Sequence, residues 1–301
     1  IQYLVGGKHL GEAGLHPAPA PSAAAQTRQQ RQLRAGLGLV ATLVAAPALL
    51  HVTGVVRVSA LGLSRAFGLL LTLTVLLSFI GLLFFGDWTP LERKRLVAIA
   101  VLFVAAVLFW SVFEQAGSTL NLFAERSTDK QVLGFSFPAS WFQSLNALMI
   151  VTLAPVFAWL WVKLGASNPS SPAKFSLGLV CAGLGFAVMA GASGLARAGA
   201  QVSPLWLFTT YLLHTIGELC LSPVGLSAMT KLAPARVGGL IMGIWFLSIS
   251  VGNYLGGRIA GLYESLSLPM LFGSVAAFAV VCGLLLAAFA GPIKNLMGGA
   301  D

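Results

Sequence analysis

Two carboxylates stand inside long apolar stretches of this sequence, where an acid is costly. Glu114 lies in the run 96–122, and Glu218 lies in the run 204–225. A carboxylate near the centre of a membrane helix costs at least about 2.5 kcal/mol, so each side chain must face protein or a water-filled cavity. Such side chains are candidates for moving protons or binding a charged solute. The alternative for each glutamate is a structural role as the buried partner of an arginine or a hydroxyl.

Each glutamate shares one face of its predicted helix with other polar or aromatic residues. The face around Glu114 carries Trp110, Gly117, Ser118 and Asn121. The face around Glu218 carries Tyr211, His214, Thr215 and Ser222. A water-filled cavity between helices explains both polar faces at once.

Three further side chains are candidates, each with a structural alternative. Asn146 places an amide in the run 140–163, where an interhelical hydrogen bond without a solute is the alternative. Trp245 could face a ligand, although a lone tryptophan also serves in packing or as an interface anchor. His214 could relay protons near neutral pH, or a neighbouring carbonyl could satisfy it.

The composition indicates an integral membrane protein. Of the 301 residues, 57% are apolar and 9% are charged, whereas soluble domains carry about 25% charged residues. The net charge of +9 does not indicate a nucleic-acid partner, because the 18 lysines and arginines are scattered between the apolar runs. The sequence predicts an all-α polytopic membrane protein with eight transmembrane helices, at about 35–56, 66–86, 96–122, 140–163, 175–195, 204–225, 238–256 and 269–290.

The residue patterns indicate neither a cofactor nor an enzyme. Cys181, Cys220 and Cys282 each lie inside an apolar run, without the spacing of metal ligands. Ser193 in a Gly-Ala-Ser-Gly run, followed by His214, is similar to the pair of rhomboid-type intramembrane proteases. Ser193 ends its run, however, whereas His214 lies well inside the next one, and a dyad needs both side chains at one depth.

The distribution of basic residues predicts the topology. If residue 1 starts in the cytoplasm and each run crosses once, the cytoplasmic segments hold 12 lysines and arginines and the outer segments hold 6. The positive-inside rule therefore places both ends of the chain in the cytoplasm. Gly252 and Gly256, four residues apart, predict close helix packing in the seventh run.

Four stretches together resemble the proton-dependent oligopeptide transporter (POT/PTR) family of the major facilitator superfamily. They are FWSVFEQAGSTLNLFA (109–124), QSLNALMIVTLAPVFA (143–158), YLLHTIGELCLSPVGL (211–226) and GGLIMGIWFL (238–247). They look like the seventh, eighth, tenth and eleventh helices of that family, in order, and the resemblance covers most of 96–291. It requires no cofactor.

The resemblance implies a role for each candidate. Glu114 would be the proton-coupling acid. Glu218 would receive the amino terminus of a peptide, helped by Asn146. Ser222 and Trp245 would line side-chain pockets, and Trp110 would belong to the same substrate site.

The resemblance also divides the chain. Residues 1–34 would be the end of a preceding helix, in 1–11, and a cytoplasmic linker. Residues 35–95 would be the helix pair that prokaryotic members insert between their bundles, 96–291 the C-terminal six-helix transport bundle, and 292–301 a cytoplasmic tail. The first bundle, with its Glu-x-x-Glu-Arg motif, is absent from this sequence.

We therefore expect the C-terminal half of a proton-coupled symporter for di- and tripeptides in the cell membrane. Its partners would be the peptide, protons, the lipid bilayer and the missing N-terminal bundle. The alternatives are a family member that carries another solute, and a non-transporting assembly or scaffold subunit in which both acids are structural.

Overall fold

The structure is a computed structural model, and it describes residues 22–54, 59–132, 134–196 and 200–300. Residues 1–11, where the end of a preceding helix is expected, lie outside the described residues, as does the first part of the predicted linker, up to residue 21. The chain divides into two compact units, Ile1–Phe67 and Gly68–Asp301. The first holds α2 (Ala23–Val52) and the start of α3 (Ala60–Phe84), and the second holds the rest of α3 and all later elements.

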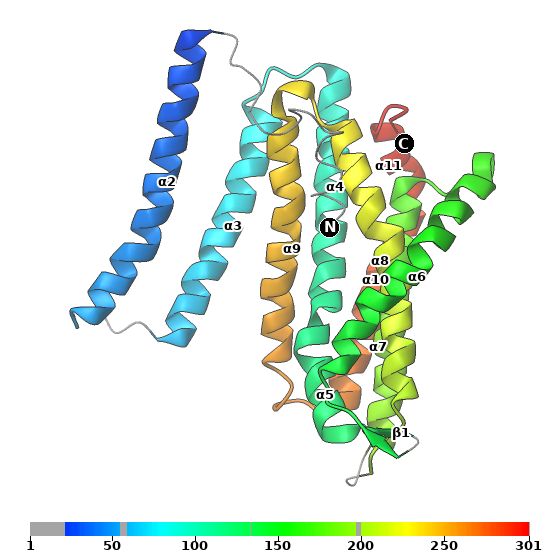
Figure 1. Cartoon of the computed structure of the whole chain (residues 1–301). Coiled ribbons are helices and arrows are strands. Elements are labelled where there is room, and N and C mark those ends of the chain that lie inside the picture. The colour runs from blue at the N-terminus through cyan, green and yellow to red at the C-terminus, as the bar shows by residue number, and fades with distance from the viewer. Residues whose placement is uncertain (1–21, 55–58, 133, 197–199, 301) are drawn as a thin grey trace, which may run out of the picture. The chain divides into compact units, whose positions relative to one another are not determined.

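The second unit is a bundle of long helices (Figure 1). In chain order its further elements are α4 (Pro90–Phe113), η1 (Glu114–Gly117), α5 (Thr119–Ser127), β1 (Gln131–Val132), β2 (Phe135–Ser136), α6 (Trp141–Leu164), η2 (Gly165–Ser167), α7 (Ser171–Leu195), α8 (Leu205–Leu232), η4 (Ala235–Val237), α9 (Gly238–Ala260), α10 (Leu268–Ala288) and α11 (Ala290–Leu296).

Seven of the described helical segments are long and apolar enough to cross a membrane, and these confirm the predicted class of all-α polytopic membrane protein. They correspond to the last seven of the eight predicted runs. The first run, 35–56, falls mostly in α2, which is not one of the seven. Helix α2 begins well before that run, with three arginines in its first half.

Helix α4 begins before the apolar run because its first turn is capped. The Thr89 side chain accepts a hydrogen bond from the Glu92 backbone N–H (3.2 Å), and the Glu92 carboxylate accepts one from the Thr89 backbone N–H (2.8 Å). Pro90 occupies the first turn, where no intrahelical donor is needed. This capping box sets the start of the helix that carries Glu114.

The predicted single helix over 96–122 is interrupted. Helix α4 ends at Phe113, a 3-10 turn follows from Glu114 to Gly117, and α5 then begins at Thr119. Buried Gln115 bridges the break, because its side-chain amide donates to the Ser111 carbonyl (3.2 Å) and accepts from the Thr119 hydroxyl (3.1 Å). The prediction of one uninterrupted polar face through Glu114 is therefore wrong, because the helical period changes at that residue.

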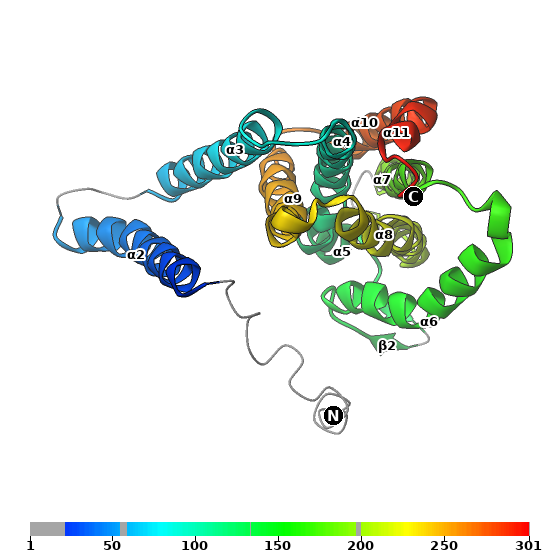
Figure 2. The ribbon, with the colours of Figure 1, turned by 90° about the horizontal axis from the view of Figure 1, so that it is seen from above.

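Helix α7 packs against α8 and α10, α4 packs against α9, and α6 lies against α8 (Figure 2). A Cβ added at Gly217 of α8 would lie 2.7 Å from the Gly178 carbonyl oxygen of α7. On α9, a Cβ at Gly252 would collide with Trp110, and one at Gly256 would lie 2.9 Å from the Ser111 carbonyl oxygen. The close packing predicted for Gly252 and Gly256 is confirmed, because both bring α9 onto the α4 backbone.

Candidate functional site

The centre of the site is a hydrogen-bonded set that joins α6 and α8. The Asn146 amide donates to one carboxylate oxygen of Glu218 (2.9 Å) and contacts the Thr215 hydroxyl (3.1 Å). The Thr215 hydroxyl itself donates to the Tyr211 carbonyl (2.8 Å), one turn earlier on α8. The Glu218 side chain is thus held on one side by an amide. The structure brings together Asn146 and Glu218, which the sequence placed in separate runs.

Glu114 lies at the junction of α4 and η1 and is half-buried. No hydrogen-bond or ion-pair partner of its carboxylate is found among the described residues. Glu114 begins the 3-10 turn whose Ala116 carbonyl lies 3.4 Å from the Tyr211 hydroxyl of α8, the helix that carries Glu218. Two carboxylates on neighbouring helices inside an apolar bundle favour a state in which a proton or an external cation reduces their total charge.

Neither glutamate is the partner of an arginine in the described part of the chain. The ion pairs found there are Arg126–Glu264 (2.6 Å), Lys130–Glu125 (2.9 Å) and Arg236–Glu92 (3.9 Å). All six residues lie near or beyond the ends of the long helices. The structural alternative in which a buried arginine neutralises the site acids has no support in these contacts.

Tyr211 links the two segments that carry the acids. Its ring is 2% exposed, and its hydroxyl donates to the Ala116 carbonyl at 3.4 Å. Ala116 belongs to the 3-10 turn that starts with Glu114. The spacing of Tyr211, Thr215 and Glu218 already placed them on one face of α8. The bond to η1 could not be read from the sequence, because it depends on the break after α4.

The two candidate tryptophans are packed inside the bundle. Trp245 is 2% exposed, lies against Gly225 of α8, and meets the Phe175 ring edge-on with centroids 6.3 Å apart. Trp110 is 6% exposed, and its indole N–H has no hydrogen-bond partner among the described residues. Both indoles are packed between helices in this structure, as the packing alternative for Trp245 expected, and the roles of Trp110 and Trp245 in a substrate site stay predictions. Ser222 is half-buried on α8, about one turn beyond Glu218.

His214 is enclosed by aromatic rings. Its side chain is 1% exposed, with the Phe186 ring stacked at 5.4 Å and the Phe113 ring at 6.0 Å between centroids. The Ser193 hydroxyl donates instead to the Ala190 carbonyl (2.9 Å), and no hydrogen bond between described residues joins it to His214. These surroundings do not favour a serine–histidine dyad.

The cysteines are separate thiols. Cys220 is buried, Cys181 and Cys282 are half-buried, and all three are free. Within the described ranges, no group of three or more histidine, cysteine, aspartate or glutamate side chains could hold a metal ion.

Comparison with known proteins supports one family. The POT family pattern matches residues 86–275. The peptide transporter YePEPT of Yersinia enterocolitica subsp. palearctica is 43% identical over 251 residues, which are 81% of this chain and 49% of that protein. The di-/tripeptide transporter of Lactococcus lactis subsp. cremoris is 34% identical over 211 residues, covering 69% of this chain and 42% of that protein.

Solved structures give the same result over nearly the whole chain. The crystal structure of a peptide transporter POT in complex with sulfate has a TM-score of 0.82 and 36% identity, and the match covers 98% of this chain and 59% of that one. A POT family transporter in complex with 5-aminolevulinic acid has a TM-score of 0.83 and 30% identity, over 97% of this chain and 60% of that one. The chain spans about half the length of the curated relatives it matches. It belongs to the POT family and is a multi-pass membrane protein.

Proposed function

We propose that this chain forms the C-terminal half of a proton-coupled symporter for di- and tripeptides in the cell membrane. The observation that carries the proposal is the pair of glutamates inside the apolar bundle, Glu114 and Glu218, whose segments are joined by the Tyr211–Ala116 hydrogen bond and which have no cationic partner among the described residues. The names of the relatives, a peptide transporter and a di-/tripeptide transporter, support the substrate class.

Glu218 receives the amino terminus of the peptide in this proposal. Asn146 occupies one of its carboxylate oxygens, which leaves hydrogen-bonding capacity for an ammonium group. An ammonium supplies the positive charge that the half-buried carboxylate lacks, in a charge-assisted hydrogen bond. Ser222 and Trp245 line the pockets for the peptide side chains in this proposal, and Trp110 belongs to the same substrate site.

Glu114 carries the coupled proton. A proton on Glu114 removes a negative charge from the turn that Tyr211 joins to α8, so protonation and solute binding at Glu218 influence each other's free energy. Its place at the junction of α4 and η1 supports this role, because the helix changes its period there. The Tyr211 hydroxyl joins that junction to α8, the helix of Glu218.

A complete transport site needs a second bundle. Transporters of this kind bind their solute between two repeated bundles that rock around it. The N-terminal bundle, with the basic residues for the peptide carboxylate, is thus a partner of this chain. Residues 35–95 are the inserted helix pair and 292–301 the tail, a portion of which lies in α11. The segments assigned to the cytoplasm hold 12 lysines and arginines against 6 in the outer segments, which supports a cytoplasmic location for both ends of this chain.

The proposal is tested with the full-length protein in liposomes. A labelled dipeptide should accumulate when the outside is acidic, and the accumulation should vanish when a proton carrier dissipates the gradient. Unlabelled di- and tripeptides should compete, and free amino acids should compete poorly. Accumulation that is insensitive to the proton carrier would contradict proton coupling, and the absence of any peptide binding would favour the scaffold alternative.

A second solute class has one observation in its favour. The POT family transporter with a TM-score of 0.83 was solved in complex with 5-aminolevulinic acid. That compound carries an amino group, which suits Glu218 as well as a peptide does. If 5-aminolevulinic acid competes more strongly than any di- or tripeptide, this chain belongs to a carrier of that solute class.

A further inference from the structure

A long apolar groove of about 720 Å³ runs along α4, where α10 and α11 lie beside that helix (Figure 2). Its described lining is apolar throughout, apart from the thiol of Cys282. On α4 the lining runs from Val97 to Leu108. Because each helical residue rises about 1.5 Å, these positions span about 16 Å. One leaflet contributes about half of the roughly 30 Å hydrocarbon core, so the groove has the length of one leaflet.

A smaller hollow of about 360 Å³ continues the groove at the start of α4. Both hollows have Val97 and Leu296 in their lining, so they are continuous. The smaller one is also lined by Trp88, Pro90, Arg93 and Lys94. The apolar groove therefore ends at two basic side chains.

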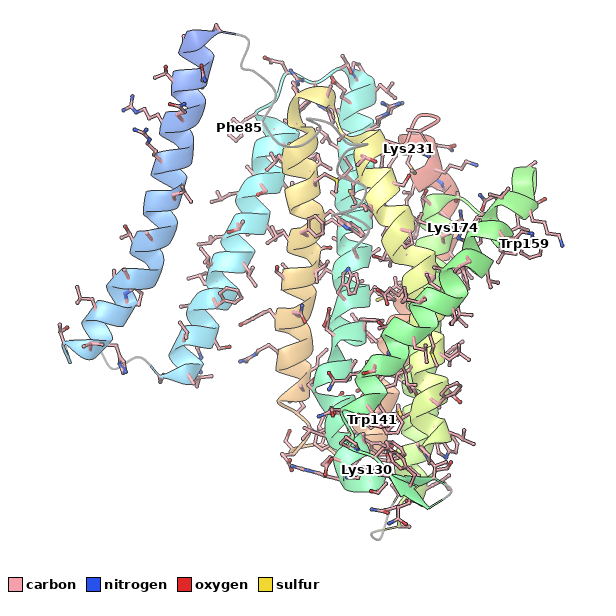
Figure 3. All side chains as sticks on the ribbon, viewed as in Figure 1. Phe85, Lys130, Trp141, Trp159, Lys174 and Lys231 are labelled. Carbon is pink, nitrogen blue, oxygen red and sulfur yellow. The ribbon has the colours of Figure 1, made fainter. Side chains whose placement is uncertain are left out.

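This basic end lies on the side of the bundle that the distribution of lysine and arginine predicts to be cytoplasmic. Figure 3 shows Phe85, directly after α3, toward the same end as Lys231 in the last turn of α8, and opposite Lys130 and Trp141. Anionic lipids give the cytoplasmic leaflet a negative surface potential, which attracts basic side chains at the ends of transmembrane helices.

The charges of Arg93 and Lys94 are available to an anion. Both side chains are exposed, and neither forms an ion pair within the described ranges. The acid in the same turn, Glu92, accepts a hydrogen bond from the Thr89 backbone N–H (2.8 Å) and pairs with Arg236 at 3.9 Å. None of the described residues that line either hollow is acidic. The basic end thus has a net positive charge that its own lining does not neutralise.

The wall beside these two residues is held in place. The Trp88 indole N–H donates to the Leu82 carbonyl, and the Arg236 guanidinium lies 4.0 Å from the centre of the Trp88 ring. Tryptophan is enriched at the level of lipid headgroups, where basic side chains also keep their charged ends in water. Trp88, Arg93 and Lys94 therefore mark a headgroup level at the open end of the groove.

We propose that this groove binds one anionic phospholipid of the inner leaflet, with its phosphate on Arg93 and Lys94 and one acyl chain along α4 and α10. The positive charge matches the phosphate, and the apolar lining matches an acyl chain in composition and in length. Neither Asn146 nor Glu218 lines the two hollows, so the lipid site is separate from the candidate solute site. Its acyl chain lies along the helix that ends directly before Glu114.

The headgroup contacts are tested by native mass spectrometry of the full-length protein in non-ionic detergent with added lipids. Phosphatidylglycerol should bind in preference to phosphatidylcholine, whose headgroup is zwitterionic. Each basic residue near the surface contributes about fivefold, so R93Q/K94Q should bind phosphatidylglycerol about 25-fold more weakly. R93K/K94R keeps both charges and should bind within about threefold of the native protein. The matched control K163Q/K231Q removes two charges from the ends of α6 and α8, outside both hollows, and should also stay within threefold.

The acyl-chain contacts are tested by filling the groove. Val104 lines it and is 54% exposed, so Val104→Trp places an indole in the groove without disturbing the core, and it should weaken phosphatidylglycerol binding at least tenfold. The control Leu284→Trp changes a residue of α10 that is 58% exposed and lines neither hollow, and it should have less than a threefold effect.

Four outcomes would overturn the proposal. They are equal losses in R93Q/K94Q and K163Q/K231Q, equal binding of the two lipids, unchanged lipid binding by the Val104→Trp protein, and displacement of the lipid by millimolar glycerol phosphate, which has the headgroup chemistry without acyl chains. A dimer of the native protein that Val104→Trp and R93Q/K94Q both abolish would also overturn it, because the groove would then hold a second copy of the chain.

Discussion

Replacing Glu218 with glutamine removes the charge of the side chain but keeps an acceptor for its hydrogen bond with Asn146, so the effect of the charge can be measured by itself. The side chain keeps its shape, and its amide oxygen can still accept the hydrogen bond that the Asn146 amide donates at 2.9 Å. A peptide with a free amino terminus loses its ionic partner in this variant, whereas an N-acetylated peptide never has one. The variant therefore separates recognition of the ammonium from general damage to the site.

The magnitude follows from the surroundings of the carboxylate. Two charges about 4 Å apart interact by about 4 kcal/mol at an effective dielectric constant of about 20, and by about 1 kcal/mol in bulk water. Glu218 is half-buried and has no cation paired with it among the described residues. We expect a loss between these limits, about 2–3 kcal/mol, which is a weakening of about 30- to 150-fold.

The assay is competition for labelled dipeptide binding to the full-length transporter, with free and N-acetylated dialanine as competitors. The control is Glu125→Gln, which removes a carboxylate from an exposed ion pair with Lys130. We expect the Glu218→Gln protein to bind the free peptide about 30- to 150-fold more weakly than the native protein does. Its affinity for the N-acetylated peptide should fall by less than about threefold. Equal losses for the two peptides would refute the assignment of Glu218 to the peptide amino terminus.

Three further variants test the fold and the coupling between the acids. Gly252→Ala should lower the stability measured by thermal unfolding in detergent by about 1–3 kcal/mol, because the new Cβ collides with α4. The control Gly257→Ala adds a Cβ that meets nothing within 4 Å, so it should change the stability by less than about 0.5 kcal/mol. Thr89→Ala removes the cap of α4 and should cost about 1 kcal/mol in the same assay, while Thr89→Ser should not. Tyr211→Phe removes the hydroxyl that bonds to the Ala116 carbonyl. It should reduce gradient-driven accumulation several-fold and leave peptide affinity within about twofold, and an unchanged accumulation would contradict the link between the acids.

The sequence predicted the features that depend on composition and on the spacing within one helix. The spacing of two glycines identified where α9 approaches α4, and the roles of Glu114 and Glu218, chosen because they are acids inside apolar runs, stay predictions. Resemblance to the family placed Asn146 beside Glu218, and the structure gives that pair as a hydrogen bond.

Other features depend on neighbours that are distant in the sequence. The break at Glu114 forms where buried Gln115 bonds to Ser111 and Thr119, and the helical period of the run gave no sign of it. The burial of Trp245 requires a glycine at position 225, on another helix. A short helix, α11, also forms in the chain beyond the last apolar run, where it packs against α4.

The central claim is that Glu114 couples a proton to solute movement, and one comparison tests it most directly. Glu114→Gln and the control Glu125→Gln are reconstituted as full-length protein in liposomes, and each is assayed for gradient-driven dipeptide accumulation and for exchange of dipeptide without a gradient. The account predicts that Glu114→Gln loses accumulation and keeps exchange, while Glu125→Gln keeps both. Accumulation of peptide by the Glu114→Gln protein under a pH gradient would contradict the account.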